Sequence, residues 1–339
     1  MYIVAAILGF SLLIIVHELG HFMMAKFNGI KVEEFSIGMG PEIFSRKGKE
    51  TQYSLRLLPI GGYVKMLGED EASNDERSFS SKSPLRRISV IIAGATMNII
   101  FALVAFTLVF SNYGFALPVV DKVIENSPAL EAGLQDGDEI KKIDGSRVFA
   151  NSDVSVGIQL SEGNPIELLV DRNGEEKEIT VTPKLTTEDG RDTYQIGFYY
   201  KTVPEPTITQ ALKQSVDNSL ALVSQTFKSL KIMITGKANF KEDVGGPVTI
   251  IRMSGEAAKN GIWSLLNFLG FISMSLAVFN LLPIPALDGG WTVILLIELI
   301  TRKKVPDKIV GTVNNIGFIL LMGLMLVVTL KDILFPVKF

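Results

Sequence analysis

The sequence predicts an α-helical polytopic membrane protein with about four transmembrane helices, a membrane-associated β-hairpin and an inserted β-rich domain. Three features support this fold class: long apolar runs without charge, a polar insert of short alternating segments, and a strand-like segment after the first run. Hydrophobic residues make up 47% of the 339-residue chain. The runs at 88–110 and 262–285 are long enough to cross a hydrocarbon core, which needs about 20 residues, and 313–330 is marginal.

Residues 2–16 form the first apolar run, and we expect them to stay in the protein as a transmembrane helix. No basic region precedes the run, and it leads into charged residues rather than a small-residue cleavage site, so it does not look like a removable signal peptide. The alternative is a soluble protein with very apolar core helices. Uncharged runs of this length are the strongest topology signal in a sequence and disfavour it.

Loop charges predict the orientation in the membrane. The connector 26–87 holds eleven Lys and Arg residues, and the short connector at 301–308 adds four. By the positive-inside rule both face the cytoplasm, which places the N-terminus, the 118–260 stretch and the C-terminus outside. The net charge of −3 argues against a nucleic-acid partner, and the absence of cysteine excludes disulfides.

Residues 118–185 predict a small β-rich soluble domain between the second and third spans. Short alternating segments are separated by the turn signals DGD, IDGS, EGNP and DRNGEE. We expect a first membrane part, the inserted domain, an amphipathic helix with linker, and a second membrane part. Their ranges are 1–117, 118–203, 204–260 and 261–339.

The segment 207–234 has helical periodicity with an apolar stripe on one face. Such a stripe is more often ordinary packing than a functional surface. It could dock on the soluble insert or lie on the outer membrane face. The stripe comprises Ile208, Leu212, Val216, Val223, Phe227, Leu230 and Ile234.

Between the first two spans, alternation and turn residues predict a hairpin at 51–69. Strand-like backbone close to a bilayer needs protein or water around it, so this segment is a candidate for lining a cavity. The alternating apolar residues and the turn residues are Tyr53, Leu55, Leu57, Pro59, Gly61 and Gly62.

The end of the first apolar run carries the sequence HELGH, with His17, Glu18 and His21. On a helix, residues four apart lie one turn above each other on one face. Two imidazoles at this spacing with a glutamate between them form the zinc-metalloprotease arrangement, in which the glutamate is the general base. These are the only two histidines in the chain. An ionisable group within a span costs on the order of 3 kcal/mol, which favours a functional role.

A catalytic zinc ion usually has three protein ligands and one open position. With no third histidine and no cysteine, the third ligand is expected to be a carboxylate, and the acids near the other apolar segments are Asp288 and Glu298. Asp288 lies in NLLPIPALDGGW (280–291), where prolines break the helix and glycines permit sharp turns, so it is favoured. Glu298 is interpreted as paired or snorkelling. The expected cofactor is one Zn²⁺ per chain.

Within the insert, NSPALEAGLQDGDEIKKIDGSRV (126–148) resembles the PDZ family, with a plain β-sandwich as the alternative. HExxH in the first span, NxxPxPxLDG in the third and a single PDZ unit together resemble the site-2 protease family of intramembrane zinc metalloproteases. The similarity is to the bacterial branch that activates envelope-stress sigma factors. It covers nearly the whole chain.

The resemblance implies His17, His21 and Asp288 as zinc ligands and Glu18 as base. It also implies that SIGMGPEIF and LRLLPIGGYVKMLGE form a membrane-associated β-hairpin that clamps an unwound substrate as an added strand. AGATMN (93–98) stands where the family has AGPxxN, so Ala95 replaces the proline, which leaves the local kink in the second span open. The implied substrate-binding candidates are Asn280, Pro283, Pro285, Gly61, Gly62, Tyr53, Leu55 and Asn98.

The expected activity is hydrolysis of peptide bonds within transmembrane segments of single-span membrane proteins, such as a pre-trimmed anti-sigma factor or a signal-peptide remnant. A peptide or substrate segment would occupy the PDZ groove, and the lipid bilayer of the bacterial inner membrane would surround the helices. Two alternatives stay open: a non-catalytic PDZ scaffold with a structural zinc site, and a zinc transporter. A structural site needs no free glutamate, so Glu18 discriminates between them.

Overall fold

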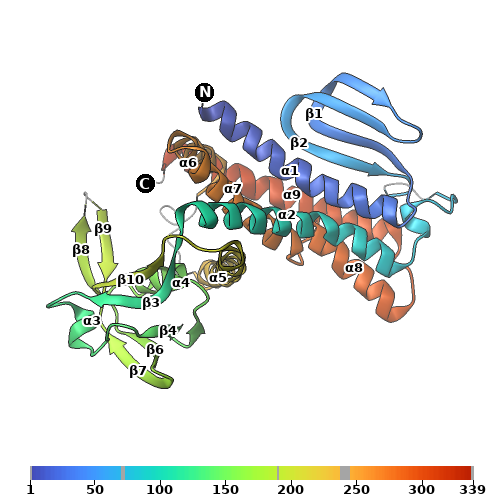
Figure 1. Ribbon diagram of the computed structural model, residues 1–339. Coiled ribbons are helices and arrows are strands. Elements are labelled where there is room, and N and C mark those ends of the chain that lie inside the picture. Colours follow the sequence, from blue (N-terminus) through green and yellow to red (C-terminus); the bar gives the residue numbers. More distant parts are fainter. Residues whose placement is uncertain (1, 70–72, 189–190, 237–244, 337–339) are drawn as a thin grey trace. The chain divides into compact units, whose positions relative to one another are not determined.

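The computed structural model describes residues 2–69, 73–188, 191–236 and 245–336, which fall into two compact units. Unit 1 comprises Met1–Ala102 and Ile232–Phe339, and unit 2 comprises Leu103–Lys231. Each unit is described separately (Figure 1).

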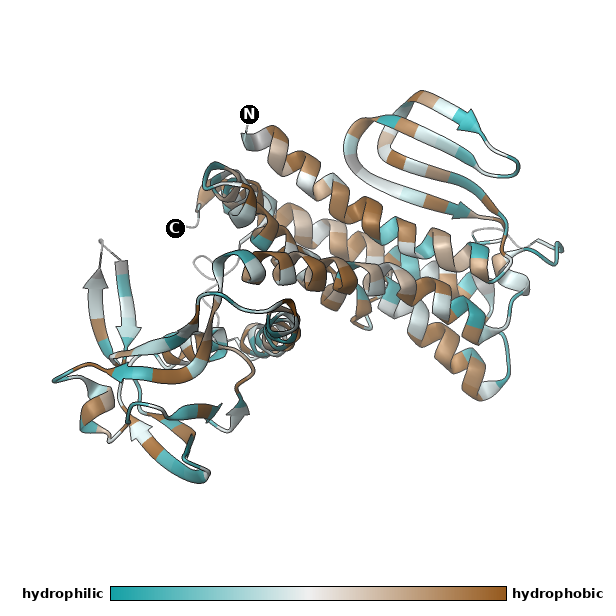
Figure 2. Cartoon of the chain, in the orientation of Figure 1, coloured by the Kyte–Doolittle hydropathy of each residue, from teal (hydrophilic) through white to brown (hydrophobic). Residues whose placement is uncertain are grey.

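Unit 1 is built mainly from helices, and four helices of the described chain are long and apolar enough to cross a membrane. They are brown over most of their length in Figure 2. The four candidate spans confirm the number predicted from the sequence. The candidate spans lie in α1 (Tyr2–Phe27), α2 (Pro84–Tyr113), α7 (Ile262–Leu281) and α9 (Asp307–Leu334), and α2 continues past Ala102 into unit 2. Unit 1 also contains the shorter helices α6 (Pro247–Lys259) and α8 (Asp288–Thr301) and a 3-10 helix at Phe79–Ser81.

α2 is an unbroken α-helix through Ala95, which is fully buried. The family's proline at this position would remove one backbone hydrogen bond and favour a kink. Ala95 restores the backbone donor, so the helix continues.

The strands β1 (Val32–Lys47) and β2 (Gln52–Met66) form an antiparallel sheet in unit 1. Both strands bend near their middle, so that residues 32–37 lie between 52–55 on one side and 62–66 on the other. Gly38 permits the bend in β1, because its φ of 83° suits glycine and a Cβ there would meet the Leu58 carbonyl. The cross-strand pairs include Lys47–Gln52, Glu42–Arg56, Phe35–Tyr53, Ile37–Leu55, Ile37–Gly62 and Val32–Met66.

This arrangement corrects the hairpin predicted at 51–69. Among the described residues, the two arms of that segment do not pair with each other but flank 32–37. The turn residues at 59–62 mark a bend within β2 rather than the turn of a hairpin. The preceding segment 32–47 supplies the pairing partner for both arms.

Two apolar clusters hold α1 in unit 1. At its N-terminal half, Leu13 packs with Leu265 and Leu269 of α7. At its C-terminal end, Ala25 packs in a cluster that includes Val90 of α2 and Leu295 of α8, together with residues of β1 and β2. α1 is therefore held against three helices and the sheet.

A buried carboxylate near the end of α9 caps α6. Asp332 accepts hydrogen bonds from the backbone N–H groups of Gly246 (3.1 Å) and Thr249 (2.7 Å) and from the Thr249 hydroxyl (2.6 Å). Gly246 is the N-cap residue of α6 and has no side chain to do this itself. The first-turn amides of α6 are thus satisfied from a distant helix.

Asp332→Ala is expected to destabilise the protein by about 2 kcal/mol, because it leaves buried backbone donors without an acceptor. The midpoint of thermal unfolding in detergent micelles measures the effect. Thr329→Ala on the same helix is the matched control, since the hydroxyl of Thr329 bonds only within its own helix. Equal midpoints for the two variants would contradict the capping role.

Unit 2 contains a mixed α/β fold around one sheet. The strand order is β10-β3-β4-β6-β7, with β5 beside β4, and β8 and β9 pair separately. A buried Asp138 receives two hydrogen bonds of 2.7 Å from Arg172 and joins the turn before β4 to β6. The elements are β3 (Phe115–Val123), α3 (Pro128–Glu131), β4 (Glu139–Ile143), β5 (Ser146–Arg147), α4 (Asn151–Leu160), β6 (Ile166–Arg172), β7 (Glu175–Val181), β8 (Lys184–Glu188), β9 (Arg191–Gln195), β10 (Phe198–Val203) and α5 (Ile208–Ile234).

The helix α5 buries small and polar residues and exposes its apolar stripe. Ala211, Gln214 and Ser215 are buried, and the Ser215 hydroxyl lies 3.0 Å from that of Thr107. Ile208, at the start of the stripe, is 74% exposed. The stripe is therefore not the face on which α5 packs within its unit.

Candidate metal centre

The two histidines of α1 meet at their Nε2 atoms. His17 and His21 lie one turn apart, and their Nε2 atoms are 3.1 Å from each other. Both side chains are largely buried, with exposed fractions of 13% and 10%. The helix thus presents two imidazole nitrogens at one point, as the HExxH spacing predicts.

Asp288, the first residue of α8, completes a three-residue group. Its Oδ2 atom lies 3.2 Å from His17 Nε2 and 3.6 Å from His21 Nε2, and the three donor atoms all lie within 4.8 Å of one another. Zinc bonds of about 2.0–2.2 Å in a tetrahedron place ligand atoms about 3.3 Å apart. The three observed separations match this spacing.

The Asp288 Oδ2 atom supports the same assignment. It is buried and has no hydrogen-bond partner among the described residues. A buried carboxylate oxygen without a partner is costly, and two converging imidazole nitrogens with a metal ion would satisfy it. The residues present therefore fit one Zn²⁺ held by two histidines and one aspartate.

The other ring nitrogens are held by α2. His21 Nδ1 lies 2.9 Å from the Val90 carbonyl oxygen, to which it donates, so Nε2 keeps its lone pair for a metal. His17 Nδ1 lies 3.3 Å from Nδ2 of Asn98, and Oδ1 of the same amide has no hydrogen-bond partner among the described residues. A metal on His17 Nε2 requires a proton on Nδ1, and a 180° turn of the Asn98 amide would bring Oδ1 into position to accept that hydrogen bond. Asn98 thus faces a metal ligand.

Gly94 makes room for both imidazoles. A Cβ on this residue would lie 2.7 Å from Cε1 of both His17 and His21. The motif AGATMN alone does not predict this role for its glycine. The feature that could have identified Gly94 is its position in the span that follows HExxH. A glycine there lets the two helices pack closely, because no side chain separates them.

The chain breaks between α7 and α8 to place Asp288. Pro283 and Pro285 lie in the break, and Ala286 has a φ of 71°, a left-handed conformation that is unusual for alanine. A Cβ on Gly290 would meet the backbone of Ile284 and Pro285. Asn280 lies in the last turn of α7, half-buried, at the start of the break.

Glu18 lies beside the edge of the sheet. A Cβ on Gly62 would be 3.6 Å from Glu18 Cγ, and the backbone of Val64 interacts with the Glu18 carboxylate. Among the described strands, residues 62–66 pair only with 32–37. The free edge of this segment therefore passes the glutamate, with Gly61 at its start.

Tyr53 and Leu55 do not lie on that edge. They line an apolar groove with a volume of about 390 Å³ between the sheet and Phe22 of α1. Phe35 contributes a ring to the same groove. The structure therefore divides the candidate substrate-binding residues of the sheet between its edge and this groove.

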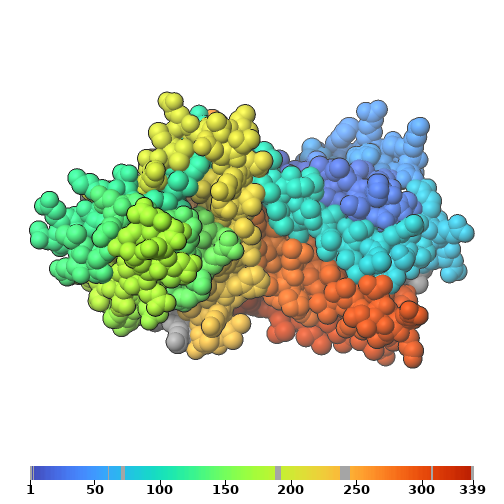
Figure 3. Space-filling model, turned by 60° about the horizontal axis from the view of Figure 1, so that its bottom comes forward, coloured from blue at the N-terminus to red at the C-terminus, as the bar shows by residue number. Residues whose placement is uncertain are grey.

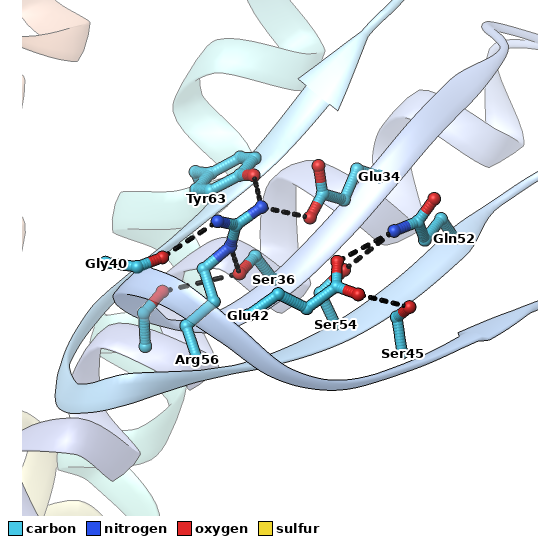
Figure 4. A network of polar contacts seen from close by, with 10 residues as sticks. Glu34, Ser36, Gly40, Glu42, Ser45, Gln52, Ser54, Arg56 and Tyr63 are labelled. Atoms are coloured by element: carbon cyan, nitrogen blue, oxygen red, sulfur yellow. Dashed lines mark hydrogen bonds and ion pairs between the residues drawn. The ribbon is translucent and has the colours of Figure 1, made fainter.

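The other face of the sheet carries a polar network around Arg56 (Figure 4). Its guanidinium donates to Glu34 (2.8 Å), to the Tyr63 hydroxyl (2.6 Å), to the Ser36 hydroxyl (3.0 Å) and to the Gly40 carbonyl (2.9 Å). Desolvation raises the pKa of Glu34, but hydrogen bonds from Ser54, Arg56 and Tyr63 outweigh it, so the net pKa lies below the usual value. The network joins the two bends of the sheet.

Unit 2 contains a separate groove between α4 and β10. Its volume is about 790 Å³, and Ile158 and Phe198 are among its lining residues. The Tyr200 hydroxyl lies 3.2 Å from the Ser155 hydroxyl of α4. Burial raises the pKa of Tyr200 to about 12, so it stays protonated at neutral pH. β10 pairs with β3 on one side, and its other edge is unpaired in the described strands.

Two histidines and one carboxylate converge beside a glutamate in a chain with four candidate membrane spans. This combination is typical of the class of intramembrane zinc metalloproteases, and comparison with known proteins places the chain in that class. The family model that matches is peptidase family M50, over residues 5–324. The chain belongs to this family, the site-2 proteases. It is a zinc-dependent protease of the membrane.

Relatives extend over nearly the whole chain. The Clostridium perfringens protein CPE1693, a zinc metalloprotease by name, is 53% identical over 337 residues, which cover 99% of this chain and 100% of that protein. Zinc metalloprotease RasP of Geobacillus kaustophilus is 30% identical over 413 residues and covers 98% of this chain and 97% of its own. The protease eep of Enterococcus faecalis is 30% identical over 419 residues, with 98% of both chains covered.

Proposed function

We propose that this protein cleaves transmembrane segments of single-span membrane proteins at the centre formed by His17, His21 and Asp288. The observation that carries the proposal is the convergence of these three donor atoms next to Glu18 and the free sheet edge. In this proposal the two histidines and Asp288 hold the zinc ion. The bound ion supplies an activated water and polarises the scissile carbonyl.

The residues around the ion have separate roles in this proposal. Glu18 accepts a proton from the attacking water on its carboxylate and passes it to the leaving amine. Asn98 and the Val90 carbonyl hold the two imidazoles in the required tautomer. Asn280 contacts the substrate backbone near the scissile bond, and Pro283 and Pro285 shape the break that lines the site.

A substrate helix must be unwound before water can reach its carbonyl groups. Each unpaired backbone group costs several kcal/mol in hydrocarbon, so a replacement partner is needed. The free edge at 62–66 offers backbone groups for an added strand beside Glu18, and Gly61 and Gly62 leave space for its approach. Tyr53 and Leu55 would take an apolar side chain of the substrate in their groove.

Unit 2 is proposed to be a PDZ domain spanning 118–203. The groove between α4 and the unpaired edge of β10 has the form that strand addition of a peptide requires. With the N-terminus, this domain and the C-terminus outside the inner membrane of a bacterium, the groove would meet substrates already trimmed on that side. Pre-trimmed anti-sigma factors and signal-peptide remnants are substrates of this kind.

Two co-expressed single-span reporters test the proposal, one with an intact outer domain and one truncated. We expect an intramembrane cut in the truncated reporter and little in the intact one. The absence of a cut in several truncated reporters, with folded and zinc-loaded protein, would favour a scaffold role.

Asp288→Asn is expected to lower zinc affinity by roughly 100-fold or more, because loss of a direct ligand should exceed the 10–100-fold effect of losing a supporting residue. Zinc content after dialysis against a zinc buffer, measured by elemental analysis, reports the change. Asp217→Asn, on α5 in the other unit, is the matched control. Unchanged zinc in Asp288→Asn would remove it from the ligand set. Glu298, the other acid considered, is paired with Arg87 at 2.7 Å, which confirms the pairing expected for it.

A further inference from the structure

A basic pocket lies where α2 begins and α8 ends, and its volume is about 440 Å³. Lys82 lines it from just before α2 and Arg87 from the first turn of α2, and Arg302 and Lys303 line it from the segment after α8. In Figure 3 the surface of the start of α2 (cyan) adjoins that of α8 (orange). All of these residues belong to unit 1.

The charge in the pocket is strongly positive. Glu298 pairs with Arg87 and offsets one cation. Within the part of the chain that the structure describes, Lys82, Arg302 and Lys303 have no ion-pair partner. A phosphate diester would be attracted by three cations at this one pocket.

The pocket lies at the start of a candidate membrane span, because Pro84 lines it. Pro84 and Lys308 are the first residues of two candidate spans. Apolar side chains next to the cations are exposed: Leu85 by 61%, Leu299 by 36% and Ile300 by 79%. A ligand that fits both surfaces has an anionic head and apolar chains.

An adjoining cavity has polar atoms without partners. It has a volume of about 270 Å³ and is lined by Arg87, Glu298 and Asn314, among others. The Arg87 side chain is 8% exposed, and its Nε has no hydrogen-bond partner among the described residues, nor does Asn314 Oδ1. Polar atoms left without partners in a cavity of this size suit a hydroxyl-bearing headgroup.

We propose that this pocket binds the headgroup of an anionic phospholipid. The phosphate lies among Lys82, Arg302 and Lys303, headgroup hydroxyls enter the adjoining cavity, and the acyl chains lie over Leu85 and Ile300. Exposed cations anywhere in the connectors would suffice to orient the chain in the membrane. Orientation of the chain in the membrane requires neither a pocket nor a buried arginine beside it. The positive-inside rule alone therefore does not account for the cations that line this pocket.

The bound lipid would steady the metal centre. α2 carries Val90, which holds His21, and α8 begins with Asp288. The Arg87–Glu298 pair joins these two helices at the pocket. A headgroup that contacts both sides therefore stabilises the relative position of two segments that hold the metal ligands.

The test uses the full-length protein in maltoside micelles, with dioleoyl phosphatidylglycerol or dioleoyl phosphatidylcholine added. Native mass spectrometry is expected to show one phosphatidylglycerol retained, with at least roughly tenfold preference over phosphatidylcholine. The double variant Arg302→Gln/Lys303→Gln is expected to weaken phosphatidylglycerol binding by roughly tenfold to thirtyfold. In micelles without added phospholipid, its zinc content should match that of the wild type, which shows that the variant is folded.

Lys47→Gln/Lys49→Gln is the matched control, because it removes the same charge from the exposed turn between β1 and β2. Equal losses in the two double variants would overturn the proposal, as would equal retention of both lipids by the wild type. Binding of glycerophosphoglycerol as tight as that of the intact lipid would identify a soluble phosphate ligand and also overturn it.

Discussion

Glu18→Gln is expected to lower kcat for reporter cleavage by roughly 10²- to 10⁴-fold, with zinc content unchanged. Glutamine has nearly the same shape but cannot accept the proton of the attacking water. The Glu18 carboxylate does not belong to the group of three side chains that converge at the metal centre, so metal binding should persist. Quantitative cleavage of the truncated reporter, together with elemental analysis, measures both quantities.

The control for this variant is Glu256→Gln, an exposed glutamate of α6. Its activity should equal that of the wild type. Full activity in Glu18→Gln would rule out the general-base role. Loss of zinc in the same variant would instead place Glu18 among the ligands.

Gly94→Ala is expected to remove activity and to lower zinc affinity by roughly tenfold to 100-fold. The added methyl group would lie 2.7 Å from a ring carbon of each histidine, and Nδ1 of each imidazole is already in contact with a residue of α2. The rings must therefore leave the positions at which their Nε2 atoms meet. Zinc titration of the purified variant measures the loss.

Gly323→Ala separates this steric effect from the general effect of a glycine substitution in an apolar helix. Apart from its chain neighbours and the nearby backbone of α9, no atom of a described residue lies within 4 Å of the added Cβ at this position. Activity and zinc affinity should equal those of the wild type. Wild-type affinity in Gly94→Ala would mean that α1 and α2 separate easily and would contradict the packing described here.

Local spacing made much of the metal centre predictable from the sequence. His17 and His21 meet because a helix returns to the same face after four residues, and the apolar run that carries them ensures the helix. The same run lengths correctly predicted four spans. Because the chain has no third histidine and no cysteine, the candidates for the third ligand were the two acids Asp288 and Glu298. The helix-breaking residues around Asp288 favoured this acid, and it lies beside the two histidines.

Contacts between distant segments were less accessible to sequence reasoning. Residues 52–66 pair with 32–47, where glycines and a proline interrupt the alternation of apolar and polar residues. The sequence therefore did not indicate this partner strand, and the hairpin turn predicted at 59–62 was wrong. The role of Gly94 follows from the packing of α2 against α1, which the sequence does not show. The apolar stripe of α5 showed correctly that a helix forms, but periodicity does not say which face packs within the unit, and small residues such as Ala211 do so here.

The capping of α6 by Asp332 has a consequence for the order in which the chain assembles. The first turn of α6 precedes Asp332 by more than one full candidate span, so its amides cannot bond this carboxylate until the ribosome has made the end of α9. Asp288 is likewise made long after His17. A nascent chain that has inserted only its first two spans carries two of the three side chains proposed to bind the metal and lacks the third. Proteolytic capacity would therefore arise late in synthesis, when the chain is almost fully inserted, which would protect neighbouring nascent membrane proteins from an unfinished enzyme.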